Sequence, residues 1–236
     1  MVLSQCPRLW ITTPPQQGQV QLRPDQCHYL QRVRRLHPGD RVLLVIEGRL
    51  WQGRWQGGMG VCLEECLEVK APALCPLHLG IGIPKQGMDD LLYTLTELGV
   101  AVITPLLTER TIPRPTPQRW QRWQRICEEA AEQSEQLQLP QVHPPTPLTL
   151  WLEQQQQPVW VGVTRQPAPH LTTLLHQQPR DPLRIVTGPE GGWSARELAL
   201  LQQRGGIPFS LGAGILRAVT APVVVASLVR AWWEVN

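Results

Sequence analysis

The feature that most constrains the fold is a change in the pattern of apolar residues and turns near residue 72. Before a proline-rich segment at residues 71–76, short apolar runs alternate with glycine turns, which favours antiparallel β-strands. After it, buried-type strands alternate with helices, as is typical of a parallel sheet covered on both faces. We therefore predict an α/β protein of two domains, a small β-rich one at residues 1–72 and an α/β one at residues 73–236.

In the first domain, residues 23–25 open a helical run at residues 27–36, which ends at a His-Pro-Gly-Asp turn. Three strands follow, at residues 41–46, 50–56 and 61–69. Four arginines gather around the turn, and guanidinium groups bind phosphate well. These candidate RNA-binding residues are Arg32, Arg34, Arg35 and Arg41. The alternative, an arginine-coated helix face exposed to solvent, is at least as common.

In the second domain, four buried-type strands and two helices can be read from the apolar pattern. The strands are expected at residues 77–83, 100–106, 159–163 and 183–187, and the helices at residues 88–98 and 118–136. Two further stretches, residues 140–147 and 154–157, are rich in proline and glutamine. We expect them to be surface connections or frayed helix.

A glycine loop follows the strand at residues 183–187. Thr187, Gly188, Glu190, Gly191 and Gly192 form it, and a helix begins after Ser194, whose partner in a predicted capping box is Glu197. Open α/β sheets bind ligands at such carboxyl ends of strands, and glycines let the backbone approach a ligand closely. A tight turn without any ligand is the alternative.

A second glycine loop repeats this arrangement near the end of the chain. Leu211, Gly212, Ile215, Leu216 and Arg217 follow a short strand, and Thr220 is a candidate cap for an apolar helix with Pro222 in its first turn. Two such loops can converge on one pocket rich in backbone amides and carbonyls. A pocket of this kind suits an adenine or an amino acid better than a triphosphate.

The sequence lacks the motifs that mark several other classes of functional site. The sequence has no P-loop, no nucleophile elbow and no complete dinucleotide fingerprint. Its six cysteines form no CxxC pair, so we expect reduced thiols and no metal. Neither a membrane span nor a signal pattern is present, which predicts a cytoplasmic protein. Of the 22 basic residues 20 are arginine, which fits either nucleic-acid contact or biased codon usage.

The two loops, TGPEGGWSARE and LGAGILRAVTA, resemble the RsmE family of the SPOUT methyltransferases. The resemblance extends to Lys85, to the TELGV block at residues 96–100, to AAEQS at residues 130–134, and to residues 28–42. It implies a PUA-like β-barrel followed by a SPOUT α/β domain with a C-terminal trefoil knot. It also implies S-adenosylmethionine as cofactor, methylation of N3 of a uracil in 16S ribosomal RNA of the 30S subunit, and a homodimer.

The resemblance suggests roles for the loop residues. Arg217 would stabilise the negative charge that the uracil carbonyls gain during methyl transfer; a structural or phosphate-binding role is the alternative. Lys85 would contact RNA. The expected cofactor-binding residues are Thr187, Gly188, Glu190, Gly191, Gly192, Leu211, Gly212, Ile215, Leu216 and Thr220.

Four positions depart from the family pattern. Thr94 and Gln136 stand where the family usually has basic residues, Gly214 replaces an arginine, and Val219 replaces a glutamate. Losing three cations would weaken RNA binding. Two rival functions therefore stay open: a SPOUT methyltransferase acting on another RNA position, and a non-catalytic RNA-binding protein with the same fold.

Overall fold

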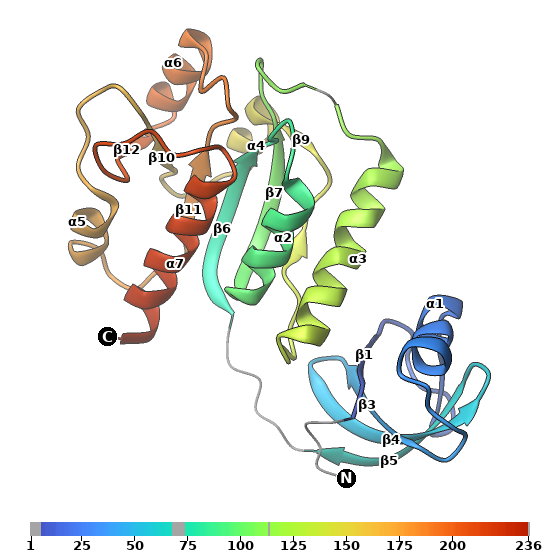
Figure 1. Ribbon diagram of the computed structural model, residues 1–236. Helices are drawn as coiled ribbons and strands as arrows, with labels where there is room; N and C mark the ends of the chain where they lie inside the picture. Colours follow the sequence, from blue (N-terminus) through green and yellow to red (C-terminus); the bar gives the residue numbers. More distant parts are fainter. Residues whose placement is uncertain (1–5, 68–73, 113, 236) are drawn as a thin grey trace. The chain divides into compact units, whose positions relative to one another are not determined.

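The computed structural model of the protein describes residues 6–67, 74–112 and 114–235 (Figure 1). Contacts divide the chain into two units. The first comprises Met1–Ala73 together with Ala131–Gln138, and the second comprises Leu74–Ala130 together with Leu139–Asn236. The short segment Ala131–Gln138 is the part that the sequence-based division does not anticipate. Its Glu132 accepts a hydrogen bond from the backbone N–H of Trp10 at 2.6 Å, which attaches it to the first unit.

The first unit is built on a five-stranded sheet in the order β1-β3-β4-β5-β2. Strand β1 runs parallel to β3, and the other pairs are antiparallel. A core that includes Leu9, Leu30, Leu44 and Trp55 lies against the sheet. The closure of this sheet into a barrel stays a prediction. The strands are β1 (Arg8–Ile11), β2 (Gln19–Gln21), β3 (Arg41–Ile46), β4 (Arg49–Gly57) and β5 (Gly60–Leu67).

The helical run of the first unit begins at Pro24, within the segment expected to open it. It consists of α1 (Pro24–His28) and a π-helical turn, η2 (Tyr29–Val33), because Pro24 is favoured in the first turn of a helix. It ends at Val33 with Arg34 as its C-cap, and Arg35 has a left-handed backbone with φ of 55°. The strand expected at residues 61–69 reaches Leu67, and its last two positions lie outside the described residues.

The second unit is built on a seven-stranded parallel sheet in the order β12-β10-β11-β6-β7-β8, with β9 also paired to β7. Its strands are β6 (Cys75–Gly82), β7 (Val100–Leu107), β8 (Gln141–Val142), β9 (Thr146–Pro147), β10 (Trp160–Gly162), β11 (Leu183–Thr187) and β12 (Ile207–Phe209). Its helices are α2 (Met88–Glu97), α3 (Pro117–Gln133), α4 (Leu148–Glu153), α5 (Leu171–His176), α6 (Ala195–Gln203) and α7 (Thr220–Val235).

Helices cover both faces of this sheet (Figure 1). Side chains from α2, α3, α5 and α7 share one core with alternate residues of the strands, such as Leu79 and Ile185. The next residue along β11, Val186, points to the other face and joins a second core with α4 and α6. The predicted parallel sheet covered on both faces is therefore confirmed.

A polar cluster lies within the second core. His78 on β6 bonds to the Thr104 hydroxyl at 2.8 Å and accepts from the indole N–H of Trp151 at 3.2 Å, and Thr104 also bonds to His143. Burial lowers the pKa of His78 to about 4, and the neighbouring His143 and Arg184 add to the effect. The neutral imidazole thus joins α4 to the sheet.

The cysteines that the second unit buries are core residues. Burial raises the pKa of both Cys75 and Cys127 to about 11, so these thiols are protonated at neutral pH. Cysteines Cys6, Cys27, Cys62 and Cys66 are also free thiols.

Two sequence expectations need correction, and several elements were not expected. Residues 140–147 contain β8 and β9, and not merely a surface connection, because an edge strand tolerates proline. Helix α4 directly follows and buries Trp151, so this part of the chain contributes to the core. Helix α3 ends at Gln133 instead of residue 136, because Glu135 has a left-handed backbone. Elements β1, β2 and α5 were not anticipated either.

Candidate functional site

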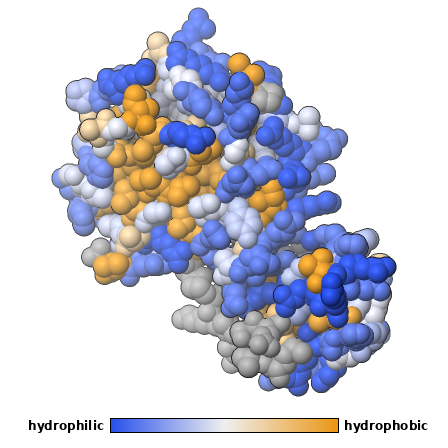
Figure 2. All heavy atoms as spheres, in the orientation of Figure 1, coloured by the Kyte–Doolittle hydropathy of each residue, from blue (hydrophilic) through white to orange (hydrophobic). Residues whose placement is uncertain are grey.

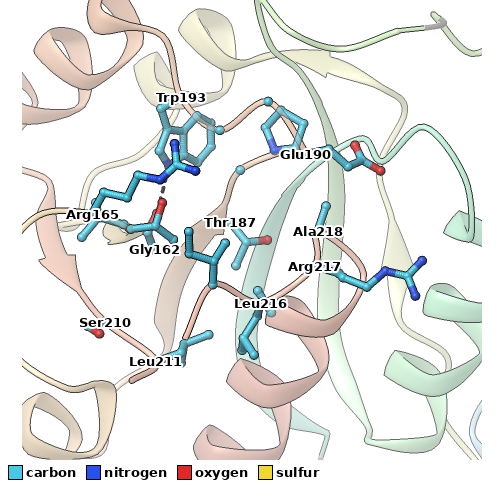
Figure 3. Close-up of a pocket in the computed structure, with 18 of the residues that line it drawn as sticks. Gly162, Arg165, Thr187, Glu190, Trp193, Ser210, Leu211, Leu216, Arg217 and Ala218 are labelled. Carbon is cyan, nitrogen blue, oxygen red and sulfur yellow. Dashed lines mark hydrogen bonds between the residues drawn. The ribbon is translucent and has the colours of Figure 1, made fainter. Parts of the chain in front are cut away.

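A cavity of about 940 Å³ opens at the carboxyl ends of the parallel strands (Figure 3). Its walls are the segments that follow β6, β10, β11 and β12, with Arg110 after β7 and the first turn of α7. Parallel strands bring their carboxyl ends to one edge of the sheet, so segments that are far apart in sequence meet there. The two glycine loops singled out in the sequence form opposite walls of this single cavity.

The first wall is residues 188–193, here called the braced loop. The backbone N–H of Lys85 donates to both carboxylate oxygens of Glu190, at 2.9 and 3.2 Å. The guanidinium of Arg110 donates to the carbonyl oxygens of Gly191 and Trp193. The Trp193 indole in turn donates to the carbonyl of Gly162 at 3.0 Å (Figure 3). Three neighbouring segments therefore fix this loop in place.

The predicted capping box behind the braced loop is confirmed. The Ser194 hydroxyl accepts from the N–H of Glu197 at 3.1 Å, and the Glu197 carboxylate accepts from the N–H of Ser194 at 2.8 Å. That carboxylate also accepts from the N–H of Glu109 at 2.8 Å. Glu197 is only 6 % exposed. A buried carboxylate with such partners ties α6 to the segment after β7.

Glycine is required where β6 passes the braced loop. A Cβ atom at Gly82 would lie 2.5 Å from the backbone nitrogen of Pro189, which is closer than any real contact. The loop can therefore rest directly on the strand only because Gly82 has no side chain. Gly192, with φ of 66°, needs glycine for its left-handed conformation instead.

The second wall includes residues 211–216, here called the open loop. Among the described residues its two hydrogen bonds both involve Ser210: the hydroxyl accepts from the N–H of Gly212 at 3.0 Å and donates to the Gly212 carbonyl at 3.2 Å. The side chain of Ile215 is 60 % exposed, and a Cβ atom at Gly212 or Gly214 would meet nothing within 4 Å. This wall is thus held only at its ends.

Between the two walls lies a hydroxyl that has no partner. Thr187, the last residue of β11, is 2 % exposed, and its Oγ1 atom makes no hydrogen bond. Burying a hydroxyl without a partner costs free energy, which a ligand in the cavity would recover. The cavity therefore suits a ligand that offers a polar group next to Thr187 and fits against glycine backbone.

The charged side chains at the cavity are mostly basic. Lys85, Arg110, Arg165 and Arg217 line it, with Glu190 as the acidic residue among the lining side chains that the structure describes. The Arg217 backbone carbonyl accepts from the N–H groups of Thr220 and Ala221, at 2.9 and 3.0 Å, so α7 fixes its main chain. Its guanidinium has no partner within the described ranges and is free to meet a ligand.

The cavity brings together most of the residues predicted for the site. Of the proposed cofactor-binding set, Thr187, Gly188, Glu190, Gly191, Gly192, Leu211, Gly212, Ile215 and Leu216 line it, as do Arg217 and Lys85. Thr220 is the first residue of α7, and so lies inside the helix and not before it. It is flanked by the lining residues Val219 and Ala221, and its contact with a ligand stays a prediction.

The other predicted RNA-binding residues lie in the first unit. Arg32, Arg34 and Arg35 are exposed at and after η2, and Arg41 is half-buried at the start of β3, where it is paired with Arg54 of β4. Arg54 itself bonds to Glu64 and to the carbonyl of Gly39. Arg41 therefore faces a partly neutralised neighbourhood, while Arg32, Arg34 and Arg35 are exposed residues.

Sequence reasoning missed one wall of the cavity. Residues 162–166 follow β10 and line it, and so do Arg110, Trp193 and Ser210. The strand before this wall was predicted, and the rule that parallel sheets bind ligands at their carboxyl ends would have pointed to the segment after it. Arg110 gave no local signal, because it reaches the braced loop from a distant part of the chain.

Within residues 6–67, 74–112 and 114–235, no group of three or more His, Cys, Asp or Glu side chains could hold a metal ion. In the same ranges no helix is both long and apolar enough to cross a membrane.

Comparison with known proteins identifies families and relatives that the chain resembles. Residues 71–230 match the RNA methyltransferase domain family, and residues 22–55 match the RNA methyltransferase PUA domain family. A Synechocystis protein named ribosomal RNA small subunit methyltransferase E is 39% identical over 225 residues, which cover 91% of this chain and 74% of the relative.

Two solved structures are similar over nearly their whole length. A methyltransferase from Legionella pneumophila, in complex with the bound cofactor SAM, has a TM-score of 0.84 at 25% identity, covering 96% of this chain and 97% of that one. A ribosomal RNA small subunit methyltransferase E from Neisseria gonorrhoeae, bound to S-adenosyl methionine, has a TM-score of 0.80 at 27% identity, covering 97% and 98%.

Proposed function

Because the chain belongs to the ribosomal RNA small subunit methyltransferase E family, we propose that it methylates N3 of a uridine in 16S ribosomal RNA with S-adenosylmethionine as methyl donor. The observation that carries this proposal is the cavity between the braced and open loops, with the unpartnered Thr187 hydroxyl inside it and the free Arg217 at its edge. The 30S subunit is the expected substrate.

The cavity residues fit S-adenosylmethionine. Gly192, Gly212 and Gly214 leave space for an adenosine and an amino acid against backbone groups, and Thr187 offers an unsatisfied hydroxyl. We assign the cofactor contacts to the residues from Thr187 to Gly192 and from Leu211 to Leu216 that line the cavity. When bound, S-adenosylmethionine supplies an electrophilic methyl group. Glu190 contributes by holding the braced loop to Lys85.

The protein's part in the reaction is positioning and electrostatics. The N3 atom of uracil must lose its proton as it reacts, so the adjacent carbonyl oxygens gain negative charge. The Arg217 guanidinium, which has donors to spare, stabilises that charge. The base has to be unpaired to present N3, because pairing occupies this atom. Orientation of the base towards the methyl donor supplies the rest of the acceleration.

The first unit contributes RNA binding. Its exposed Arg32, Arg34 and Arg35 lie at the end of η2, and residues 22–55 match a PUA domain of RNA methyltransferases. Together with Arg41 and Lys85, they are assigned to phosphate contacts. Replacing Arg32, Arg34 and Arg35 together with glutamine should weaken RNA binding and leave the cofactor affinity unchanged. Unaltered RNA affinity in that variant would contradict this assignment.

The path of the chain supports a trefoil knot of the SPOUT type. Strand β12 lies at the edge of the sheet, yet α7 packs in the same core as β6 and α2. The connecting residues pass the segments that follow β10 and β11, and Ser210 donates its N–H to the carbonyl of Pro169 on the way. An experimental density map tests the knot: a chain that passes over the segment after β10, instead of through it, would remove it.

We also propose that the protein is a homodimer in the cytoplasm. Figure 2 shows an apolar area on the second unit in the region of α7. In this helix and in the loop before it, Ile215 is exposed and Leu216, Val224 and Leu228 are half-buried. Apolar patches of this kind commonly mark protein interfaces. Light scattering coupled to size exclusion should give twice the chain mass of 26.6 kDa, and the Val224→Lys variant should give a monomer. A monomeric wild-type protein would contradict the proposal.

The decisive experiment combines methylation and nucleoside mapping. The purified protein is incubated with S-adenosylmethionine and with 30S subunits from a strain that lacks this enzyme, and the 16S RNA is analysed by mass spectrometry. One N3-methyluridine per 16S RNA is expected. A methyl group at another position would identify a different RNA target. Absence of methylation together with absence of cofactor binding by calorimetry would identify a non-catalytic RNA-binding protein.

A further inference from the structure

The positive charge of the chain is concentrated in one segment that the proposed function does not use. Residues 110–127 contain five arginines and no acidic residue. The other 17 basic residues are outnumbered by all 19 acidic residues, so the rest of the chain has a net charge of −2. Since the whole chain carries +3, this segment gives the protein its positive sign.

The structure shows where these arginines lead. Arg110 is part of the cavity wall, Arg114 is exposed in the connection that follows, and α3 then carries Arg119, Arg122 and Arg125 over its first three turns. These five residues, here called the arginine track, begin at the cavity and continue along one helix. Figure 2 shows a hydrophilic surface in the region of α3.

The helix holds this surface rigidly. The carboxylate of Asp89 on α2 accepts from the Arg122 guanidinium at 3.0 Å and from the indole of the buried Trp123 at 3.1 Å. The guanidinium of Arg119 lies 5.7 Å from the centre of the Trp123 ring. Arg125 is exposed and has no partner within the described part of the chain. Donors are therefore left over for a ligand on a fixed support.

The stability of α3 does not explain these charges. A helix dipole favours acidic residues near the amino end and basic residues near the carboxyl end. Helix α3 has the reverse order, with its arginines in the first three turns and Glu128, Glu129 and Glu132 in the last ones. Such an order is expected when binding to an anionic partner sets the charge pattern.

We propose that the arginine track binds the phosphate backbone of the RNA strand that flanks the target nucleotide. This inference rests on the proposed function and extends it, because it names the surface that receives the strand outside the cavity. Guanidinium groups match phosphate oxygens in geometry as well as charge. A strand that leaves the cavity beside Arg110 can meet Arg114 in the following connection and then the arginines of α3.

The test uses two full-length double variants that remove the same charge. Arg119→Gln/Arg125→Gln shortens the arginine track and leaves the Arg122–Asp89 pair intact. The control, Arg180→Gln/Arg204→Gln, removes two arginines that precede β11 and β12, at the amino ends of strands whose carboxyl ends face the cavity. Affinity for a 16S RNA transcript is measured by fluorescence anisotropy over a salt series, with a melting curve and an S-adenosylmethionine titration for each protein.

The track variant should bind the transcript about tenfold more weakly, with each lost contact contributing two- to fivefold. The slope of log affinity against log salt should fall by roughly 1.4, since each lost phosphate contact on a single strand removes about 0.7. The control should match the wild type, and the cofactor affinity should not change in either. Equal losses in both variants, or none in the track variant, would overturn the proposal.

Two further outcomes keep this inference separate from the proposed function. Weaker binding of the track variant to 30S subunits but not to the RNA transcript would show that the track contacts a ribosomal protein, and would also overturn the proposal. If the wild-type protein binds RNA through the track but leaves no N3-methyluridine, the proposed reaction fails while the track stands.

Discussion

The two glycine loops of the cavity look alike in sequence and differ in how they are held. The braced loop is attached to Lys85, Arg110, Gly162 and, through Glu197, to Glu109. The open loop makes its described hydrogen bonds to Ser210 alone. Glycine therefore serves close packing at Gly82 and Gly188 beside the first loop, and leaves open space at Gly212 and Gly214 in the second.

This difference indicates a division of labour. A loop with several external partners is already in its binding conformation before the cofactor arrives, so binding loses little conformational entropy there. A loop that is held only at its ends has to become ordered around the ligand. We expect that changes in the braced loop act through stability, and that changes around the open loop act through binding or rate.

The largest effect should come from Arg217, at the end of the open loop. If it stabilises charge on the uracil, Arg217→Ala should lower the single-turnover methylation rate by about 10²- to 10³-fold, or roughly 3–4 kcal/mol. Its side chain has no partner in the described structure, so the melting temperature and cofactor affinity should change little. Arg217→Lys should restore only part of the rate.

Two results would assign Arg217 another role. Joint loss of thermal stability and cofactor binding would make it a structural residue. A normal rate at saturating RNA, with weaker RNA affinity and a smaller salt slope, would make it a phosphate contact.

The next effect concerns the support of the braced loop. Glu197→Ala leaves the N–H groups of Glu109 and Ser194 without their buried acceptor, so the free energy of unfolding should fall by about 2–4 kcal/mol. Glu197→Gln keeps one acceptor oxygen and should lose about half as much. Denaturant unfolding measures both. A Glu197→Ala protein as stable as the wild type would show that the braced loop does not depend on this carboxylate.

Thr187 lies between the two loops, and replacing it should weaken cofactor binding without lowering the stability of the fold. Thr187→Val removes a hydroxyl that has no partner, so the melting temperature should stay equal or rise slightly. The affinity for S-adenosylmethionine should fall by about five- to tenfold, close to 1 kcal/mol, because a hydrogen bond to the ligand is lost. Thr187→Ser is the matched control and should bind normally. Calorimetry decides, and full affinity in the valine variant would remove Thr187 from the site.

The smallest effect is expected at Ser210. Ser210→Ala removes both hydrogen bonds to Gly212, but these are exposed, so the free energy of unfolding should change by less than about 1 kcal/mol. The cofactor affinity should change by less than threefold. A loss of stability as large as that of Glu197→Ala would mean that the two loops are held equally firmly, and would contradict the proposed division of labour between them.

Much of the fold could be predicted because local patterns follow the period of each element. Strand β11 was predicted with its observed bounds, and α2 within one residue, because apolar residues, glycine and proline mark their ends. Short elements such as β1, β2 and α5 carry too few residues for a period to show. Helix α4 was missed because its polar and proline-rich surroundings hide three buried apolar residues.

The site could be predicted wherever glycine marks a turn. Both glycine loops were found in this way, and the structure places them on one cavity. The Ser194–Glu197 capping box could also be predicted from the sequence, because both partners lie within one turn. Arg110, Arg165 and the segment after β10 were not found, because contacts between distant parts of the chain leave no local trace in one sequence.

The arrangement of the central strand has a consequence for biosynthesis. Strand β6 pairs with β11, where Leu79 lies beside Ile185, so about 100 residues must be made before that pairing can form. At roughly 5–20 residues per second, β6 waits on the order of 5–20 s for its partner on the translating ribosome. The last cavity residue, Ala221, emerges later still. A nascent chain thus cannot gain stability from cofactor binding, and until β11 is made the apolar edge of β6 stays open to aggregation or to chaperone binding.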